Sequence, residues 1–143
     1  MATLSDPLGW FTLRFPDEWQ RVTEDCVTIL KSPCGTVYVS GGRRLGGRKA
    51  GFGAATFLTD FLQFIGIAVP ETAIQSWTGG EGQRVYHYVR ESHGRHWRYF
   101  SVTDSETALL ISYTCDAADA GRECDEVDGL VASVRLSASL PLN

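Results

Sequence analysis

The sequence predicts an α+β protein in which a twisted antiparallel sheet of about six or seven strands carries two main helices. Three observations lead to this prediction. Short segments of alternating apolar and polar residues dominate the chain, turn residues separate them, and two segments have helical periodicity instead. Because the helical segments follow runs of several strands, the order is typical of an α+β fold rather than of alternating βαβ units.

Three strands are expected before the first helix. Residues 10–15 place Phe11, Leu13 and Phe15 on one face, and the strand ends at Pro16 because proline interrupts a β-ladder. Residues 22–30 alternate loosely and are followed by the turn cluster 32–35. Residues 36–40 come directly afterwards, so these two segments are predicted to form a hairpin.

The first helix is predicted over residues 57–65. Its apolar side chains fall within an arc of about 160° at 100° per residue, and polar side chains lie opposite them. Gly66 follows at the position of a C-terminal cap. We therefore expect Phe57, Phe61 and Leu62 to lie in the core.

A meander of four strands is expected next. It consists of residues 73–77, 84–91, 96–103 and 107–115, joined by short connections rich in glycine and polar residues. A second helix is then predicted from about residue 119 to residue 137. Its apolar members share an arc of about 120°, and they are Cys124, Val127, Leu130, Val131 and Val134.

Length and composition favour one globular domain over residues 1–143. Hydrophobic residues make up 43% of the 143 residues and charged residues 21%, as in ordinary globular proteins. The net charge of −4 disfavours a general nucleic-acid binder. No apolar run is long enough to span a bilayer, and no basic, then apolar leader opens the sequence. We therefore expect a cytoplasmic protein.

Four cysteines occur, at Cys26, Cys34, Cys115 and Cys124, and no C-x-x-C motif is present. Zinc-ribbon and thioredoxin-type motifs are therefore absent. Four small, buried thiols are the favoured interpretation for a reducing compartment. A disulfide between Cys115 and Cys124, which a loop separates, is the alternative.

The opening of the chain and its element order resemble a known superfamily. In residues 9–19, Gly-Trp-Phe-Thr-Leu-Arg-Phe-Pro-Asp-Glu-Trp, a short strand runs into a Pro-x-x-Trp motif. This start resembles that of PsbP-like domains, a superfamily that includes photosystem II PsbP, the Ran-binding Mog protein and bacterial DcrB-like proteins. The long strand at 109–114, an acidic loop and a last helix also look like theirs. The resemblance implies a PsbP-like α+β fold and binding of other proteins, with no catalytic residues to carry over, and fold alone does not define function.

The Gly/Arg-rich stretch over residues 41–53 is the most unusual part of the sequence. It contains Arg43, Arg44, Arg48 and Lys49 and leads directly into the first predicted helix. Glycines and a helix N-terminus suit an anion or an acidic partner, yet neither a P-loop nor a dinucleotide-binding motif is present. A solvated crossover is the favoured interpretation, contact with an acidic partner is second, and a small-anion site is third.

The three histidines, His87, His93 and His96, surround one predicted hairpin. With residues 92–95 as its connection, Glu91 faces His96 and His87 faces Phe100. His93 and His96 could share a metal, but zinc needs three or four fixed ligands. We therefore expect an exposed hairpin tip, a partly buried His87 and no metal site.

The other face of that hairpin carries aromatic side chains and an arginine. They are Tyr86, Tyr88, Arg90, Trp97 and Tyr99. Aromatic residues and arginine are enriched in protein interfaces. A position in or beside the core is the competing explanation, because aromatic residues of a sheet often lie beneath a helix.

These observations predict a non-catalytic protein-binding domain that uses no cofactor. No nucleophile motif and no cysteine–histidine spacing of a known enzyme family occurs. The predicted partner-binding residues are those of the hairpin face, with the four basic residues of the Gly/Arg-rich stretch as an electrostatic accessory. By similarity to DcrB-like proteins, a bacterial adaptor, chaperone or immunity-type protein is expected. The alternative is a small-ligand-binding module or a diverged enzyme that uses a cleft beside the Gly/Arg-rich stretch.

Overall fold

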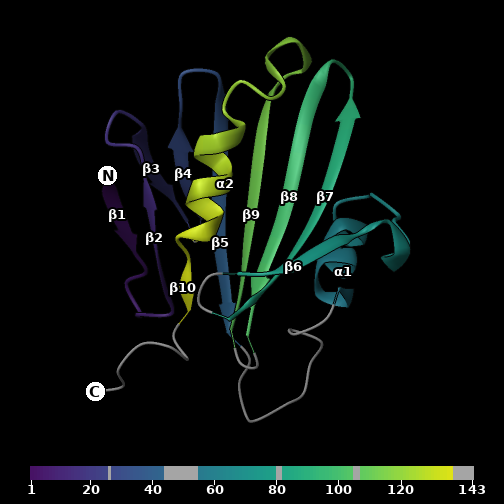
Figure 1. Cartoon of the computed structure of the whole chain (residues 1–143), viewed down its shortest axis with the longest axis horizontal. Helices are drawn as coiled ribbons and strands as arrows, with labels where there is room; N and C mark the ends of the chain where they lie inside the picture. Colours follow the sequence, from purple (N-terminus) through teal and green to yellow (C-terminus); the bar gives the residue numbers. More distant parts are fainter. Residues whose placement is uncertain (26, 44–54, 80–81, 105–106, 137–143) are drawn as a thin grey trace.

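Two antiparallel sheets form the framework of the protein. The computed structural model describes residues 1–25, 27–43, 55–79, 82–104 and 107–136. The smaller sheet has the order β1 (Ala2–Ser5), β2 (Phe11–Phe15), β10 (Arg135–Leu136). The larger sheet has seven strands in the order β3 (Gln20–Glu24), β4 (Val27–Lys31), β5 (Gly35–Arg43), β9 (Thr107–Asp116), β8 (Arg95–Thr103), β7 (Arg84–Ser92), β6 (Gln75–Thr78). The α+β prediction is therefore confirmed (Figure 1).

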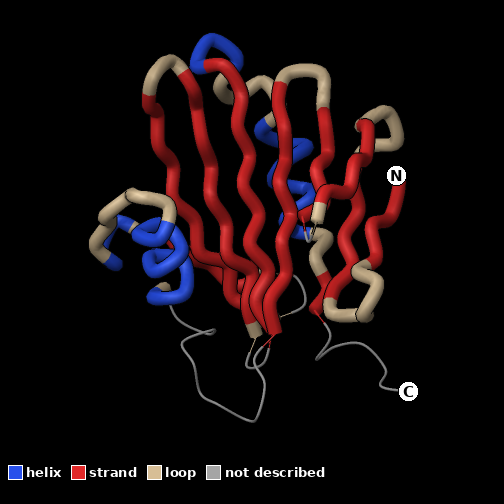
Figure 2. The backbone as a smooth tube through the Cα atoms, turned by 180° about the vertical axis from the view of Figure 1, so that it is seen from behind, coloured by secondary structure: helices blue, strands red, loops and turns tan. Residues whose placement is uncertain are grey.

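The two α-helices lie on opposite faces of the seven-stranded sheet. Helix α2 (Cys124–Ala132) covers the face that looks toward the viewer in Figure 1. Helix α1 (Thr56–Phe64) lies on the other face, near the β6 end of the sheet, and is in front in Figure 2. Two short 3₁₀ helices, η2 (Glu71–Ala73) and η3 (Ala117–Asp119), precede β6 and α2. Each face of the sheet consequently has its own hydrophobic cluster.

The main core lies between the larger sheet, α2 and the smaller sheet. Phe11, Leu13 and Phe15 point into it from β2, as their alternation predicts. Val127, Leu130 and Val131 enter from α2, and Phe100 and Ile111 from the sheet are fully buried. The side chain of Val134, just after the helix, is buried as well.

The second cluster lies beneath α1. Leu58 and Leu62 of the helix pack with Tyr86 and Tyr99 of the sheet and with Ile67. Leu62 is therefore in the core as predicted, whereas Phe57 and Phe61 are only half-buried. The predicted apolar arc was too wide, because Phe64 and Ile65 at the helix end are exposed. A helix that lies near one end of a sheet has no partner for such a broad face.

Several elements differ from the sequence prediction. Strands β1 and β10, which pair with β2 in a separate sheet, were not expected, and five strands rather than three precede α1. The expected strand at residues 22–30 is a hairpin of β3 and β4, because Asp25 adopts a left-handed backbone conformation (φ 50°) that asparagine and aspartate tolerate better than most residues. The last helix is shorter than residues 119–137, since η3 and a turn at Gly121 come before it. As a result Cys124 begins the helix and is exposed, contrary to its predicted place on the apolar arc.

The β7–β8 hairpin has the predicted register. Glu91 pairs with His96 and His87 with Phe100. The connection is shorter than expected, because His93 and Gly94 alone form the turn, both with positive φ (55° and 77°). Two residues with positive φ are typical of the type I′ turn, whose twist matches that of the flanking strands.

A buried carboxylate fastens the start of α2 to the sheet. Glu123 accepts hydrogen bonds from the Tyr113 hydroxyl and the Ser32 hydroxyl, both at 2.7 Å, and from the backbone N–H of Cys34 at 3.2 Å. Burial and the Glu123 carboxylate raise the pKa of Tyr113, so its hydroxyl stays a donor.

Gly35 lies beside this contact. A Cβ atom at position 35 would lie 2.5 Å from the Thr114 carbonyl oxygen, so the close approach of β5 to β9 requires glycine there.

Candidate functional site: the open sheet face

Among the described elements, α1 covers only one end of the face of the larger sheet on which it lies. A row of consecutive cross-strand partners runs over this face through six strands, and it consists of Val22, Ile29, Tyr38, Ser112, Tyr99 and Tyr88. At the α1 end of the row Tyr99 is 5% exposed, whereas Tyr38 is 38% exposed and Val22 39%. This whole face is here called the open face, and away from α1 it presents aromatic and aliphatic side chains to solvent.

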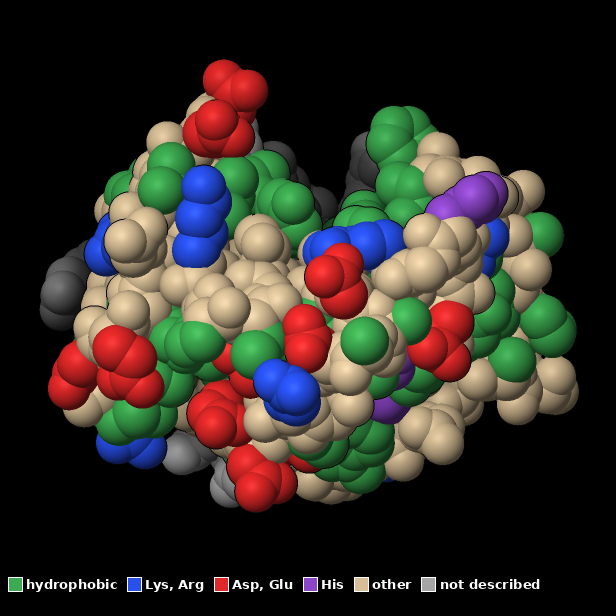
Figure 3. Space-filling model, turned by 90° about the horizontal axis from the view of Figure 1, so that it is seen from above, with side chains coloured by type: hydrophobic (Ala, Val, Ile, Leu, Met, Phe, Trp, Pro, Cys, Tyr) green, Lys and Arg blue, Asp and Glu red, His purple; other side chains and the backbone are tan. Residues whose placement is uncertain are grey.

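A pocket of about 590 Å³ lies on the open face next to α1. From above, the molecule is hollowed between two raised parts (Figure 3). The apolar lining comes from Val27, Phe61, Ile65, Ile67, Trp97, Tyr99 and Leu110. Tyr38, Ser40, Ser112 and the hairpin residues Arg90, Ser92, His93 and Arg95 complete the wall. The size suits a small ligand or a few side chains of a partner.

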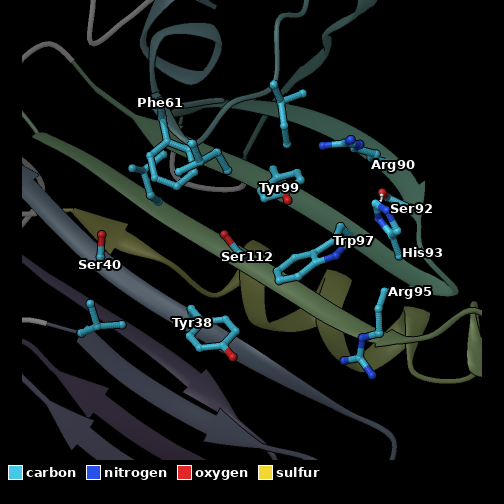
Figure 4. A pocket seen from close by; sticks show the side chains of 14 residues that line it. Tyr38, Ser40, Phe61, Arg90, Ser92, His93, Arg95, Trp97, Tyr99 and Ser112 are labelled. Carbon is cyan, nitrogen blue, oxygen red and sulfur yellow. Dashed lines mark hydrogen bonds between the residues drawn. The ribbon is translucent and has the colours of Figure 1, made fainter. Parts of the chain in front are cut away.

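Trp97 lies near the middle of the pocket. Figure 4 shows its indole ring over the sheet, with Tyr38 on one side and Arg90 on the other. Arg90 is its direct cross-strand partner, and the ring of Tyr99 lies parallel to the indole at a centroid distance of 5.7 Å. Burial raises the pKa of Tyr99, with nearby Arg90 acting in the opposite direction. A flat, half-buried indole beside a guanidinium is the kind of group that anchors protein interfaces.

Apart from two tyrosines, the ionisable side chains among the described residues that line the pocket are basic in type. They are Arg90, His93 and Arg95, and no aspartate or glutamate is among the lining residues. Arg95 forms an ion pair with Asp116 at 2.8 Å, and His93 Nδ1 lies 2.8 Å from the Ser92 hydroxyl. Within the described chain, the ion pairs do not include Arg90. The hairpin end of the pocket is therefore a positive region on a protein of net charge −4.

The structure brings the five predicted hairpin residues together on one face but gives them different environments. Tyr86 and Tyr99 are buried beneath α1, as the competing core explanation requires. Tyr88, Arg90 and Trp97 are half-buried, and Arg90 and Trp97 line the pocket.

The predicted basic accessory falls mostly outside the described residues. Three of its members lie there, namely Arg44, Arg48 and Lys49. Arg43 is the last residue of β5, but the structure does not describe its side chain.

Sequence reasoning missed the half of the pocket that comes from other parts of the chain. Tyr38 alternates with the buried Val37 and Val39, so its outward position on the opposite face was readable from the strand pattern. Ser112 and the segment after α1 carried no such signal. Their place in the pocket depends on the strand order, which puts β9 between β5 and β8.

A second polar cluster, on the α2 side of the sheet, was also missed. His87 Nε2 accepts a hydrogen bond from Arg98 Nε at 3.1 Å, and His87 Nδ1 lies 3.1 Å from Gln75 Oε1. Arg98 also pairs with Asp128 of α2 at 2.7 Å. Burial, followed by the charge of Arg98, lowers the pKa of His87 to about 4. Because both ring nitrogens are engaged, this histidine connects β6, β7 and α2 rather than serving as a free base.

Among the described residues, no group of three or more histidine, cysteine, aspartate or glutamate side chains is arranged to hold a metal ion. Cys34, Cys115 and Cys124 are free thiols, so the alternative disulfide is not formed. The prediction of buried thiols is correct for Cys115 and wrong for Cys34, which is half-buried, and for Cys124, which is exposed. Cys26 lies outside the described residues. No helix in the described part of the chain is long and apolar enough to cross a membrane.

Comparison with solved structures identifies the fold. Cyanobacterial PsbP from Synechocystis sp. PCC 6803, known from its solution structure, is similar with a TM-score of 0.67 at 12% identity over 94% of this chain and 91% of that protein. A Bacteroides thetaiotaomicron crystal structure at 1.50 Å is similar with a TM-score of 0.66 at 13% identity, over 94% of this chain. Our chain spans about half of the Bacteroides protein, 47% of its length.

These similarities confirm that the chain has the PsbP-like fold. At such identities the likeness concerns the fold alone. No family model matches the chain, and no curated protein matches it.

Proposed function

We propose that the protein is a non-catalytic binding domain that docks another polypeptide on the open face. The observation that supports this most strongly is the pocket around Trp97, where aromatic and arginine side chains lie half-exposed on an otherwise well-packed sheet. Exposed aromatic and arginine groups beside an apolar hollow provide most of the binding energy in protein interfaces.

The shape of the site favours a polypeptide over an enclosed small molecule. Pockets for small molecules bury most of the ligand surface. This pocket is open and continues along the sheet into the exposed side chains of Tyr38 and Val22. A bacterial adaptor, chaperone or immunity-type role in the cytoplasm remains part of the proposal. Free thiols at the described cysteines are compatible with that compartment.

Site-specific cross-linking tests the proposal. A photoreactive phenylalanine analogue is placed at Tyr38, on the open face, or at Val89, which is 44% exposed on the opposite face. Both proteins are irradiated in lysate of the source organism, and cross-linked polypeptides are identified by mass spectrometry. We expect a polypeptide that cross-links to position 38 but not to position 89.

The identified polypeptide must then bind saturably in purified form. We expect excess unmodified protein to compete with cross-linking at position 38, and excess of the Trp97→Ala variant to compete poorly. Equal cross-linking from both positions, or equal competition by both proteins, would contradict docking on the open face.

A further inference from the structure

Arg90 is a cation that lacks a carboxylate partner within the described chain. The ion pairs of that part of the protein use the N-terminus, Arg95, Arg98 and Arg122. Arg90 is half-buried on β7, directly across from Trp97, and it lines the pocket. Its planar guanidinium is suited to bidentate pairing with a carboxylate, and the aromatic neighbourhood strengthens such a pair by excluding water.

The opposite end of the pocket is apolar. It is lined on the helix side by Phe61 of α1 and by Ile65 and Ile67, which follow α1. On the sheet side it is lined by Tyr99 and Leu110. Tyr99 lies between Phe61 and Arg90, and Trp97 lies beside Tyr99 (Figure 4). The pocket therefore combines a place for a bulky apolar group with a place for an anion.

We propose that the pocket recognises a polypeptide segment in which a carboxylate side chain lies close to a bulky apolar side chain. The carboxylate pairs with Arg90, and the apolar side chain enters the hollow beside Phe61. This inference rests on the proposed function and specifies the partner by its chemistry. Charge complementarity supports it, because none of the described residues that line the pocket is acidic and Arg95 is already paired with Asp116.

The probes that test this inference are two pools of capped ten-residue peptides. In one pool glutamate alternates with leucine or phenylalanine, and in the other glutamine replaces every glutamate. Each pool is titrated into ¹⁵N-labelled protein, and apparent dissociation constants are taken from the shift of the Trp97 indole N–H resonance. A single-stranded oligothymidine of ten nucleotides is titrated under the same salt conditions.

Two variants accompany the wild-type protein. Arg90→Gln removes the proposed anchor, and Arg21→Gln is the matched control. Arg21 is an exposed arginine of β3, and it pairs with the core residue Leu30, so it lies on the other face of the sheet. Amide spectra and melting curves of both variants verify that they remain folded.

We expect the glutamate pool to bind wild type at least threefold more tightly than the glutamine pool. Arg90→Gln removes this preference, whereas Arg21→Gln keeps it. If both pools bind equally and shift Trp97, the carboxylate inference is wrong although peptide docking on the open face stands. If neither pool shifts Trp97 at millimolar concentration, or if oligothymidine binds at least as tightly as the glutamate pool, the inference is overturned and the proposed function loses its support.

Discussion

At the scale of single residues, two buried polar side chains, Glu123 and His87, each connect several elements through hydrogen bonds. Glu123 joins the start of α2 to the β4–β5 turn and to β9 through three donors. His87 joins β6 and β7 to α2 through Gln75, Arg98 and Asp128. Because a buried donor or acceptor without a partner costs more than a hydrogen bond contributes, each of these networks is sensitive to the loss of one member.

The first prediction concerns Glu123. Replacing it with alanine leaves the Tyr113 hydroxyl and the Cys34 N–H without their acceptor, and it leaves the Ser32 hydroxyl with the Gly35 carbonyl alone. We therefore expect a loss of about 2–4 kcal/mol in the free energy of unfolding. Glu18, which is exposed in the turn after β2, is the control, and Glu18→Ala should change that free energy by less than about 0.5 kcal/mol. Urea titration measures both. Equal effects of the two substitutions would show that the Glu123 network contributes little.

The second prediction concerns the pH dependence of stability. In the unfolded chain a histidine binds a proton below about pH 6.5. In the folded protein the pKa of His87 is lowered to about 4, so His87 binds a proton only near pH 4 and below. Between these two pKa values the unfolded state binds more protons than the folded state. The contribution of neutral His87 to stability is therefore present above pH 6.5 and is lost as the pH falls toward 4. We expect His87→Gln, which can still accept from Arg98, to be less sensitive to acid than wild type.

Chemical denaturation at pH 7, 6, 5 and 4.5 provides the measurement for His87. The control is His93→Gln, because His93 is exposed at the hairpin tip. This variant should follow the wild-type curve. Parallel pH curves for wild type and His87→Gln would mean that His87 is not kept neutral by its surroundings.

At the scale of elements, α1 shows how far an amphipathic pattern can be interpreted. Its inner side chains Leu58 and Leu62 are fully buried, but Phe64 is 88% exposed and Phe61 lines the pocket. A helix that lies near one end of a sheet turns only part of its apolar surface toward the core. The remaining apolar surface is available at the rim of the open face.

The third prediction separates the two sides of α1. Leu62→Ala should lower the free energy of unfolding by about 2–5 kcal/mol, as expected for a large buried side chain. Phe64→Ala should change it by less than about 0.5 kcal/mol, and Phe61→Ala should fall between the two because Phe61 is half-buried. Thermal and denaturant unfolding measure the order. An effect of Phe64→Ala as large as that of Leu62→Ala would contradict the placement of the helix.

Local sequence signals predicted the elements more successfully than their assembly. The β7–β8 register was predictable because the Ser-His-Gly-Arg connection leaves a single pairing that keeps the aromatic side chains on one face. The break between β3 and β4 was not, since one aspartate with positive φ gives no clear pattern. The two-residue β10 and its pairing with β2 were missed as well, because such a short strand depends on tertiary contacts.

The candidate site could be predicted only in part for the same reason. Arg90 and Trp97 were found because they are neighbours on a hairpin. The pocket is completed by residues from elements distant in sequence, among them Tyr38, Ser112 and Phe61. Their place in the pocket depends on the strand order, which the sequence did not predict. The two buried tyrosines, Tyr86 and Tyr99, could not be separated from the accessible residues without knowing where α1 lies.

At the scale of the whole molecule, the fold has one closed and one open face. The closed face packs against α2 and the three-stranded sheet, and the open face carries α1 only near its β6 end. The same PsbP-like scaffold occurs in proteins with very low sequence identity to this one. We therefore assign the proposed binding to the side chains on the open face, with Trp97 as the central anchor.

The affinity of the purified cross-linked partner for three forms of the protein tests this claim most directly. The forms are wild type, Trp97→Ala and Val89→Ala, and their melting curves establish that each is folded. Since aromatic anchors contribute about 2 kcal/mol or more, we predict binding at least about 30-fold weaker for Trp97→Ala, mainly through faster dissociation, and unchanged binding for Val89→Ala. Unchanged affinity of a folded Trp97→Ala variant, or an equal loss for Val89→Ala, would contradict the open face as the binding surface.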